Sequence, residues 1–146
     1  MNFAPETHSF LRSHRISVLT VLMDDGAPHS ASLHYAWDEK TGKFIFFTRS
    51  RTVKFQALKS GAKKASMVIG FSDEEFCTIQ MRGEARICTN DAAKQAYCEK
   101  YRHILEFLRD SNAAFIEFQP TWYRYSDLRQ NPAAKISSED SKGQLA

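Results

Sequence analysis

The sequence has few cysteines and no long apolar run. Its 146 residues include three cysteines, Cys77, Cys88 and Cys98, which lie about ten residues apart without a C-x-x-C spacing. This spacing predicts neither a disulfide framework nor a zinc site, so we expect reduced thiols. No stretch approaches the roughly 20 apolar residues that cross a bilayer, and residues 1–14 do not form the apolar block of a secretory signal. We therefore expect a cytoplasmic protein with no membrane partner.

The motifs of several enzyme classes are also missing. The sequence contains no G-x-S-x-G, H-E-x-x-H, Walker A or G-x-G-x-x-G pattern, which leaves the usual hydrolase, metalloprotease, P-loop and dinucleotide-fold interpretations without their defining residues. His29 and His34 are five residues apart and fall on opposite faces of a predicted strand, and no two histidines lie at metal-ligand spacing. We expect no metal site and no side chain that acts as a nucleophile.

The composition is that of one globular domain. Hydrophobic residues make up 42% of the chain and charged residues 25%, which is typical of a folded domain with a single core. The segment over residues 137–143 is small and polar, as loose chain ends often are. We expect one domain over residues 1–131 and a flexible C-terminal tail over residues 132–146.

The positive charge is concentrated in one segment. Seven lysines and arginines lie between residues 43 and 64, and no Asp or Glu occurs from residue 43 to residue 72. Because the net charge of the whole chain is +3, the rest of the chain carries −4. This distribution indicates one local anion-binding region and argues against a basic surface that coats nucleic acid.

Most of the predicted elements are strands. Short apolar or alternating runs predict strands over residues 16–22, 33–37, 44–48, 65–71, 76–88, 114–119 and 122–125. A short helix is expected after residue 51, and a long one over residues 93–108, capped by Thr89 or Asn90. The run over residues 76–88 is long enough to require a bend, for which Gly83 is the natural position, and Pro120 is expected to interrupt the last strands. We predict a mainly β, antiparallel barrel of six or seven strands with inserted helices.

Hydroxyl groups and cations gather where a predicted strand passes into a helix. The segment FFTRSRTVK over residues 46–54 alternates them closely, and hydroxyls, guanidinium groups and the N–H groups of a helix start all bind phosphate oxygens. The same composition fits a solvated basic face with a polar helix cap, and residue types alone leave both interpretations open. The aromatic and basic residues 122–125 are equally ambiguous between stacking on a planar ligand or nucleobase and ordinary strand packing.

Several segments occur in an order and spacing known from one family. They are ISVLTV at residues 16–21, DGAPHSAS at 25–32, FFT at 46–48, TVKFQAL at 52–58 and IQMRGEA at 79–85. Together they resemble the pyridoxamine-phosphate-oxidase-like family of FMN-binding split β-barrels, over residues 10–87. The resemblance implies a Greek-key split barrel and favours the phosphate of FMN as the anion at residues 46–54. The short chain is similar to the general-stress-protein branch of that family.

The resemblance also implies a cofactor, a partner and a set of contacts. It implies a homodimer that holds two FMN molecules at its interface, each touched by both chains. The residues that it places at the flavin phosphate are Thr48, Arg49, Arg51, Thr52 and Lys54. The residues that it places along the ring and ribityl chain are Ser32, Leu33, His34 and Phe47, with Thr78 and Trp122 as further contacts.

Some positions depart from the family pattern. Thr78 stands where the family often has Gln, and Val53 where the biosynthetic enzyme carries Arg. The Tyr and Arg set that grips pyridoxamine phosphate is not clearly reproduced around Tyr97 and Tyr101, and the C-terminal Arg-Leu-His motif is missing. We therefore do not expect vitamin B6 oxidation.

The sequence leaves three classes of function open. The leading expectation is an FMN-dependent oxidoreductase of unidentified substrate, in which the protein positions and tunes the flavin. The alternative is a non-enzymatic protein that uses the same barrel to bind flavin, heme or deazaflavin. Nucleic-acid binding through the basic segment and residues 122–125 is the third and least favoured class.

Overall fold

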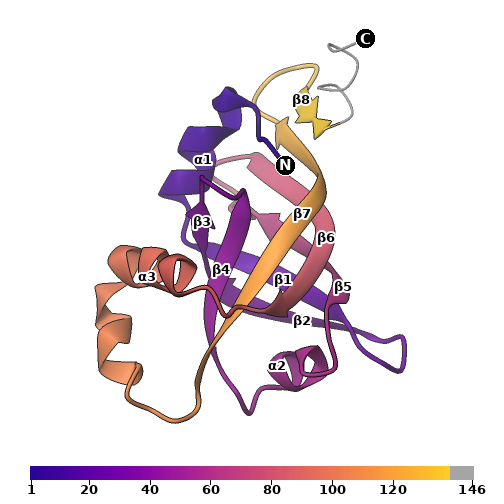
Figure 1. The fold of residues 1–146 in the computed structure, drawn as a ribbon. Helices are drawn as coiled ribbons and strands as arrows, with labels where there is room; N and C mark the ends of the chain where they lie inside the picture. The colour runs from indigo at the N-terminus through magenta and orange to yellow at the C-terminus, as the bar shows by residue number, and fades with distance from the viewer. Residues whose placement is uncertain (139–146) are drawn as a thin grey trace.

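A single antiparallel sheet forms most of the molecule. The computed structural model describes residues 1–138, and Figure 1 shows a curled sheet with short helices at its margins. The strands are β1 (Ile16–Leu22), β2 (Pro28–His34), β3 (Ala36–Asp38), β4 (Lys43–Arg49), β5 (Lys63–Ile69), β6 (Cys77–Ile87), β7 (Ala113–Asp127) and β8 (Ala134–Ser137). The α-helices are α1 (His8–Ser13), α2 (Val53–Leu58) and α3 (Asp91–Lys100), and the 3₁₀ helices are η1 (Pro5–Thr7) and η2 (Arg102–Phe107).

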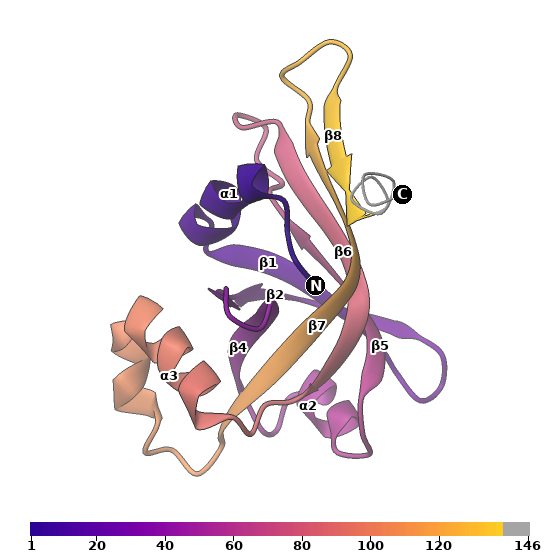
Figure 2. The ribbon, with the colours of Figure 1, turned by 45° about the horizontal axis from the view of Figure 1, so that its top comes forward.

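The strand order is that of a split β-barrel. Hydrogen-bonded neighbours follow the path β2-β1-β5-β6-β7-β4-β3, and β8 pairs with the end of β7. The sheet curls until its two ends approach, so that β2 lies beside β4, as Figure 2 shows. The mainly β, antiparallel split barrel is therefore confirmed. The number of strands is eight rather than six or seven, because β3 and β8 were not predicted as separate strands.

Tyr35 divides the segment that the alternation pattern predicts as one strand. It lies between β2 and β3, which occupy opposite ends of the sheet path. Its N–H donates to the carbonyl of Arg15 (3.0 Å), its hydroxyl donates to the carbonyl of Leu11 (2.8 Å), and its own carbonyl accepts from the hydroxyl of Tyr101 (2.6 Å). The ring is fully buried. One residue thus carries the chain across the gap between the two edges of the barrel.

The long strands β6 and β7 bend at one bulge. Their register shifts between Arg82 and Gly83, where Gly83 lies opposite Pro120. A Cβ atom at Gly83 would come within 2.0 Å of the carbonyl oxygen of Gln119, so only glycine permits this approach. The predicted bend at Gly83 is confirmed. The predicted interruption at Pro120 is wrong, because a proline at a bulge removes no regular ladder bond and β7 continues through it.

The predicted long helix is shorter than expected. Asn90 caps α3 by accepting from the N–H of Ala93 (3.0 Å), as the sequence predicts. The α-helix ends at Lys100 because Tyr101 leaves helical geometry at φ −127° and ψ 73°, and the chain continues as η2. Together α3 and Phe115 of β7 bury the face of β4 that points away from the barrel interior.

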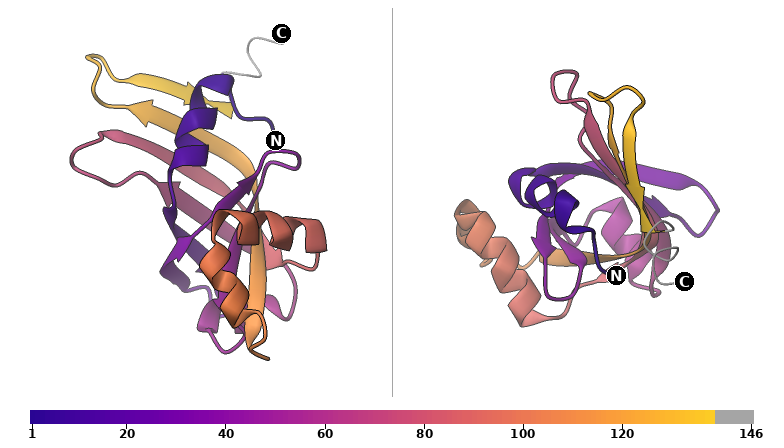
Figure 3. Two further views of the ribbon diagram at one scale, coloured as in Figure 1. Left: turned by 90° about the vertical axis from the view of Figure 1, so that its left-hand side faces the viewer. Right: turned by 90° about the horizontal axis from the view of Figure 1, so that it is seen from above.

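The two ends of the described chain also take part in the fold. Phe10 and Leu11 of α1 join the barrel core, as does Phe3 before η1. Helix α1 and the β7–β8 hairpin extend from one end of the barrel (Figure 3). Part of the predicted loose tail, Ala134–Ser137, is paired with β7, and residues 139–146 lie outside the described residues. The three cysteines are buried free thiols. Within residues 1–138, every helix is too short or too polar to cross a membrane.

Candidate functional site

Two hydroxyl groups meet at the corner between β4 and α2. Thr48 lies on the same face of β4 as the core residues Phe44 and Phe46 and is itself buried. Its Oγ1 is 3.2 Å from Oγ1 of Thr52, and the Thr52 hydroxyl donates to the carbonyl of Arg49 (2.9 Å). Thr52 occupies the N-cap position of α2 without capping it. The first N–H groups of α2 therefore have no side-chain acceptor.

Lys54 is a buried cation in the first turn of α2. Only 7% of the residue is exposed, and within residues 1–138 its amine makes neither a hydrogen bond nor an ion pair with the protein. Burial lowers the pKa of Lys54, because the charged form loses hydration. A buried charge without a partner is costly, so an anion bound beside this amine would stabilise its charged form. We call Thr48, Thr52 and Lys54 the β4–α2 corner.

The two predicted arginine ligands are not equivalent. Arg49 lies on the opposite face of β4 from Thr48, where its guanidinium pairs with Asp110 and covers the ring of Phe107 at 5.3 Å. It is therefore occupied by the protein itself. Arg51 is exposed and has no ion-pair partner in the described part of the chain, which leaves it as the arginine free to assist Lys54.

The residues predicted to contact the flavin ring lie in three places: on the outer face of β2, in the barrel core and beneath α3. Ser32 and His34 are exposed on the outer face of the edge strand β2, whereas Leu33 points inward and packs against the barrel core. Phe47 belongs to the cluster beneath α3, with its ring 5.5 Å from that of Phe115. Because β2 is an edge strand, its backbone N–H and C=O groups on the side away from β1 have no strand partner.

Thr78 and Trp122 lie on the outer face of the sheet, away from the β4–α2 corner. The Thr78 hydroxyl donates to the carbonyl of Ile69 (3.1 Å) and is satisfied within the protein. The indole of Trp122 has the guanidinium of Arg82 at 4.2 Å and that of Arg124 at 5.4 Å from its centroid. Within residues 1–138 its buried Nε1 donor has no acceptor, which is unusual for a buried indole.

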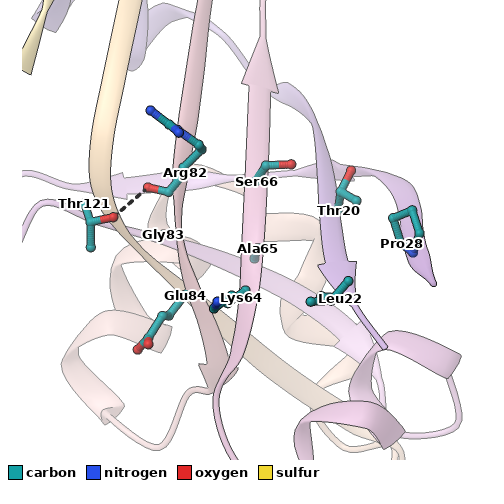
Figure 4. A pocket seen from close by; sticks show the side chains of 10 residues that line it. All are labelled: Thr20, Leu22, Pro28, Lys64, Ala65, Ser66, Arg82, Gly83, Glu84 and Thr121. Atoms are coloured by element: carbon teal, nitrogen blue, oxygen red, sulfur yellow. Dashed lines mark hydrogen bonds between the residues drawn. The ribbon is translucent and has the colours of Figure 1, made fainter. Parts of the chain in front are cut away.

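An open groove of about 520 Å³ crosses the same outer face. Figure 4 shows its lining, which comes from five strands and contains none of the predicted site residues. The lining residues are Thr20, Leu22, Pro28, Lys64, Ala65, Ser66, Arg82, Gly83, Glu84 and Thr121. The alternating polar residues of β6 predict that this face of the strand is exposed to solvent. Strand periodicity does not reveal that four other strands extend the exposed face into a groove.

The order of these elements has a counterpart in one protein family. A family model described as pyridoxamine 5'-phosphate oxidase matches residues 3–127, which is most of the chain. The chain belongs to the pyridoxamine 5'-phosphate oxidase family. The match extends beyond residues 10–87, on which the sequence resemblance rests, and includes α3 and β7. No protein of curated function matches this family member.

Solved structures share the fold of this pyridoxamine 5'-phosphate oxidase family member. One is a Clostridium acetobutylicum protein related to general stress protein 26 of B. subtilis, at 18% identity, TM-score 0.66, and 92% and 94% coverage of this chain and that one. Another is a heme binding protein from Mycobacterium smegmatis, at 16% identity, TM-score 0.70, and 94% and 60% coverage. A third is HutZ, the heme storage protein from Vibrio cholerae, at 13% identity, TM-score 0.66, and 82% and 91% coverage. At these identities the likeness concerns the fold alone.

The unpartnered amine of Lys54 predicts a stability change when it is removed. In the absence of ligand, we expect Lys54→Met to raise the free energy of unfolding by about 0.5–2 kcal/mol, because an apolar chain of similar length replaces a buried charge. The pKa of Lys54 is lower in the folded protein than in the unfolded chain. At pH values between these two pKa values the unfolded chain binds more protons, so the stability of the wild-type protein should rise with pH there. The variant should lose that pH dependence. Urea denaturation at several pH values measures both effects.

The matched control is Lys59→Met at the end of α2, where the side chain is exposed. It should change the stability little. A Lys54→Met protein that is less stable than wild type would show that the amine has a favourable partner in the folded protein.

Proposed function

We propose that this protein binds FMN and acts as a flavin-dependent oxidoreductase, with the flavin phosphate at the β4–α2 corner. The observation that carries the proposal is Lys54, which is buried and whose amine has no hydrogen-bond or ion-pair partner within residues 1–138. It follows by two positions Thr52, whose hydroxyl lies 3.2 Å from that of Thr48. A phosphate dianion at this place would neutralise the buried charge and accept hydrogen bonds from Thr48 and Thr52. The chain's membership of a family of phosphate-ester oxidases supports the same ligand class.

The residues of the corner would fix the cofactor by its phosphate. Thr48 and Thr52 would donate from hydroxyl groups that now contact each other, and Arg51 could reach the phosphate from the exposed side. Arg49 would act indirectly, because its pairing with Asp110 holds the loop between β4 and α2 against residues 110–112. Preorganised groups of this kind lower the entropic cost of binding.

The free edge of β2 suits the polar rim of a flavin ring. Unpaired backbone N–H and C=O groups alternate along this edge, and β2 lies beside β4, which leads into the corner. The bound flavin would supply the redox chemistry. The protein's part would be to hold the ring, to orient it through Ser32 and His34, and to exclude water from one side.

We also propose that the protein forms the homodimer that the family resemblance implies, and the outer face of the sheet supports this assembly. Leu22 of β1 is an exposed large hydrophobic residue on this face, and Val18 pairs there with Val68 of β5. Trp122 adds a donor that lacks an acceptor. A second copy placed on this face would cover the apolar strip and could offer the missing acceptor from its own chain or its flavin.

A second candidate function is heme binding or storage. Two structures with this fold are described as a heme binding protein and a heme storage protein. The buried amine of Lys54 could also pair with a carboxylate, so the corner alone does not distinguish a phosphate from a propionate. FMN is favoured because two hydroxyls that contact each other, a buried lysine and the start of a helix all lie within residues 48–54, and these groups are the usual ligands of a compact phosphate dianion.

Titration of the purified protein with FMN tests the proposal. Wild-type protein should bind FMN, and Lys54→Ala should weaken binding by about 1.5–3 kcal/mol, the worth of a charge-assisted hydrogen bond. Binding should also weaken as pH rises, because burial lowers the pKa of Lys54 and the neutral amine attracts phosphate less. Flavin fluorescence quenching measures the dissociation constants, with Lys59→Ala as the control. Uptake of hemin without uptake of FMN would contradict the proposal.

Turnover separates an oxidoreductase from a flavin-storing protein. We expect the FMN-loaded protein to be reduced anaerobically by NADH or NADPH and to be reoxidised over many cycles with an added acceptor. Absorbance of the flavin follows each half of the cycle. A protein that binds FMN tightly but completes less than one cycle of reduction and reoxidation with every electron donor tested would be a non-enzymatic flavin-binding protein.

The proposed dimer is tested by a charge placed within the apolar strip. Val68→Glu should shift the protein from dimer to monomer, because a carboxylate would be desolvated at the interface. Light scattering after size-exclusion chromatography measures the mass, and Lys40→Glu on the exposed turn after β3 is the control. A monomeric wild-type protein with full FMN affinity would contradict the shared site.

A further inference from the structure

A second group of cations surrounds one buried tyrosine. Tyr101 follows the last residue of α3, and 1% of it is exposed. Around its ring centroid lie the guanidinium of Arg15 at 4.9 Å, the ring of His34 at 5.4 Å, the amine of Lys100 at 5.6 Å and the ring of His103 at 6.4 Å. These four side chains come from the residue before β1, the end of β2, the end of α3 and η2. We call them the Tyr101 cluster.

The Tyr101 cluster has no acidic counterpart. Within residues 1–138, none of its four side chains forms an ion pair with an Asp or Glu, and the Lys100 amine donates only to the carbonyl of His14 (2.8 Å). The neighbouring carboxylate of Glu75 is 2.7 Å from Nε2 of His14 and is therefore already engaged. Two cations and two imidazoles thus lie around one ring without an acidic partner in the described residues, and a bound anion would offset the repulsion between the cations.

The protonation of the cluster reflects this crowding. Burial, together with the charge of Arg15, lowers the pKa of Lys100 to about 8. Burial, together with Arg15, His103 and Lys100, lowers the pKa of His34. A bound anion would reverse these shifts, since it favours the charged forms.

A groove of about 510 Å³ lies next to the cluster. Its lining residues are Ser13, His14, Arg15, Ile16, Gly70, Phe71, Ser72 and Glu75. Phe71 is 59% exposed and Ile16 45% exposed, so the groove offers apolar surface beside the guanidinium of Arg15. An acidic group at the cluster could therefore belong to a molecule whose apolar body rests in the groove.

We infer that Arg15 and Lys100, assisted by His34, form a second anion site that binds the acidic group of a small organic acid. The apolar part of this acid lies on Ile16 and Phe71. The inference rests on the proposed function in one respect, which is that the acid is the substrate of the flavin. His34 is the last residue of β2, and the flavin ring is proposed to lie along the edge of this strand. The site is separate from the β4–α2 corner, since α2 and α3 lie apart in Figures 1 and 2.

Binding of small anions to single variants tests the inference. Inorganic phosphate and succinate are titrated calorimetrically into wild-type protein saturated with FMN, and into Arg15→Gln and Lys100→Gln. We expect wild type to bind at least one of the two anions, and each variant to bind it about ten-fold more weakly. FMN affinity should change less than two-fold in both variants. The control is Lys40→Gln, an exposed lysine on the turn after β3, which should match wild type.

A second arm separates this inference from the proposed function. The same titration is repeated in Lys54→Ala without FMN, where the corner no longer carries its amine. If the anion still binds to Lys54→Ala and no longer binds to the double variant Lys54→Ala/Arg15→Gln, the result supports an anion site at the Tyr101 cluster even if FMN does not bind at all. Absence of binding of both anions to wild type, or equal affinity in wild type and Arg15→Gln, overturns the inference whether or not FMN binds. Arg15 is exposed, so its variant should fold, and thermal unfolding checks the less exposed Lys100 variant.

Discussion

The closure of the barrel at Tyr35 is the constraint on which the rest of the structure depends. A single residue connects the two strands at opposite ends of the sheet path, so neither strand can move independently of the other. Its three hydrogen bonds join the end of α1, the start of β1 and the end of α3. Without this junction, β2 would not lie beside β4, the strand that leads into the β4–α2 corner.

The molecule keeps two sets of positive charge in places where its own carboxylates do not neutralise them. Lys54 is buried without a partner, and the Tyr101 cluster combines four basic groups. Both arrangements oppose folding, and an anion that bound to them would offset this cost, since ligand binding adds its free energy to the stability of the native state. A protein tolerates such an electrostatic cost when its hydrophobic core is large. Here every long strand contributes to one continuous apolar cluster in the barrel interior.

Sequence patterns predict those features that depend on nearby residues. Alternation along β6, the bend at Gly83 and the cap at Asn90 each follow from local backbone rules, and all three are confirmed. The same kind of pattern predicts that hydroxyls and cations gather in residues 46–54, and the hydroxyls of Thr48 and Thr52 do lie 3.2 Å apart. Family resemblance, in contrast, cannot tell which face of a strand a given arginine occupies, and Arg49 points toward Asp110, a residue that lies 61 positions later.

Other features depend on contacts between distant segments and leave little local signal. Tyr35 looks like an ordinary strand residue until Leu11, Arg15 and Tyr101 are brought around it. The Tyr101 cluster draws its members from four elements, so no spacing in the chain reveals it.

The edge of β7 illustrates how the last described residues serve the fold. β4 pairs with the first part of this 15-residue strand, from Ala113 to Phe118, and β8 pairs with its last part, from Arg124 to Asp127. An uncovered strand edge is a template for intermolecular pairing. Loss of Ala134–Ser137, for example by proteolysis, would expose unpaired backbone groups and give neighbouring molecules a place to add a strand. The short β8 thereby replaces the edge of a long strand by a shorter one, which is a poorer template for such pairing.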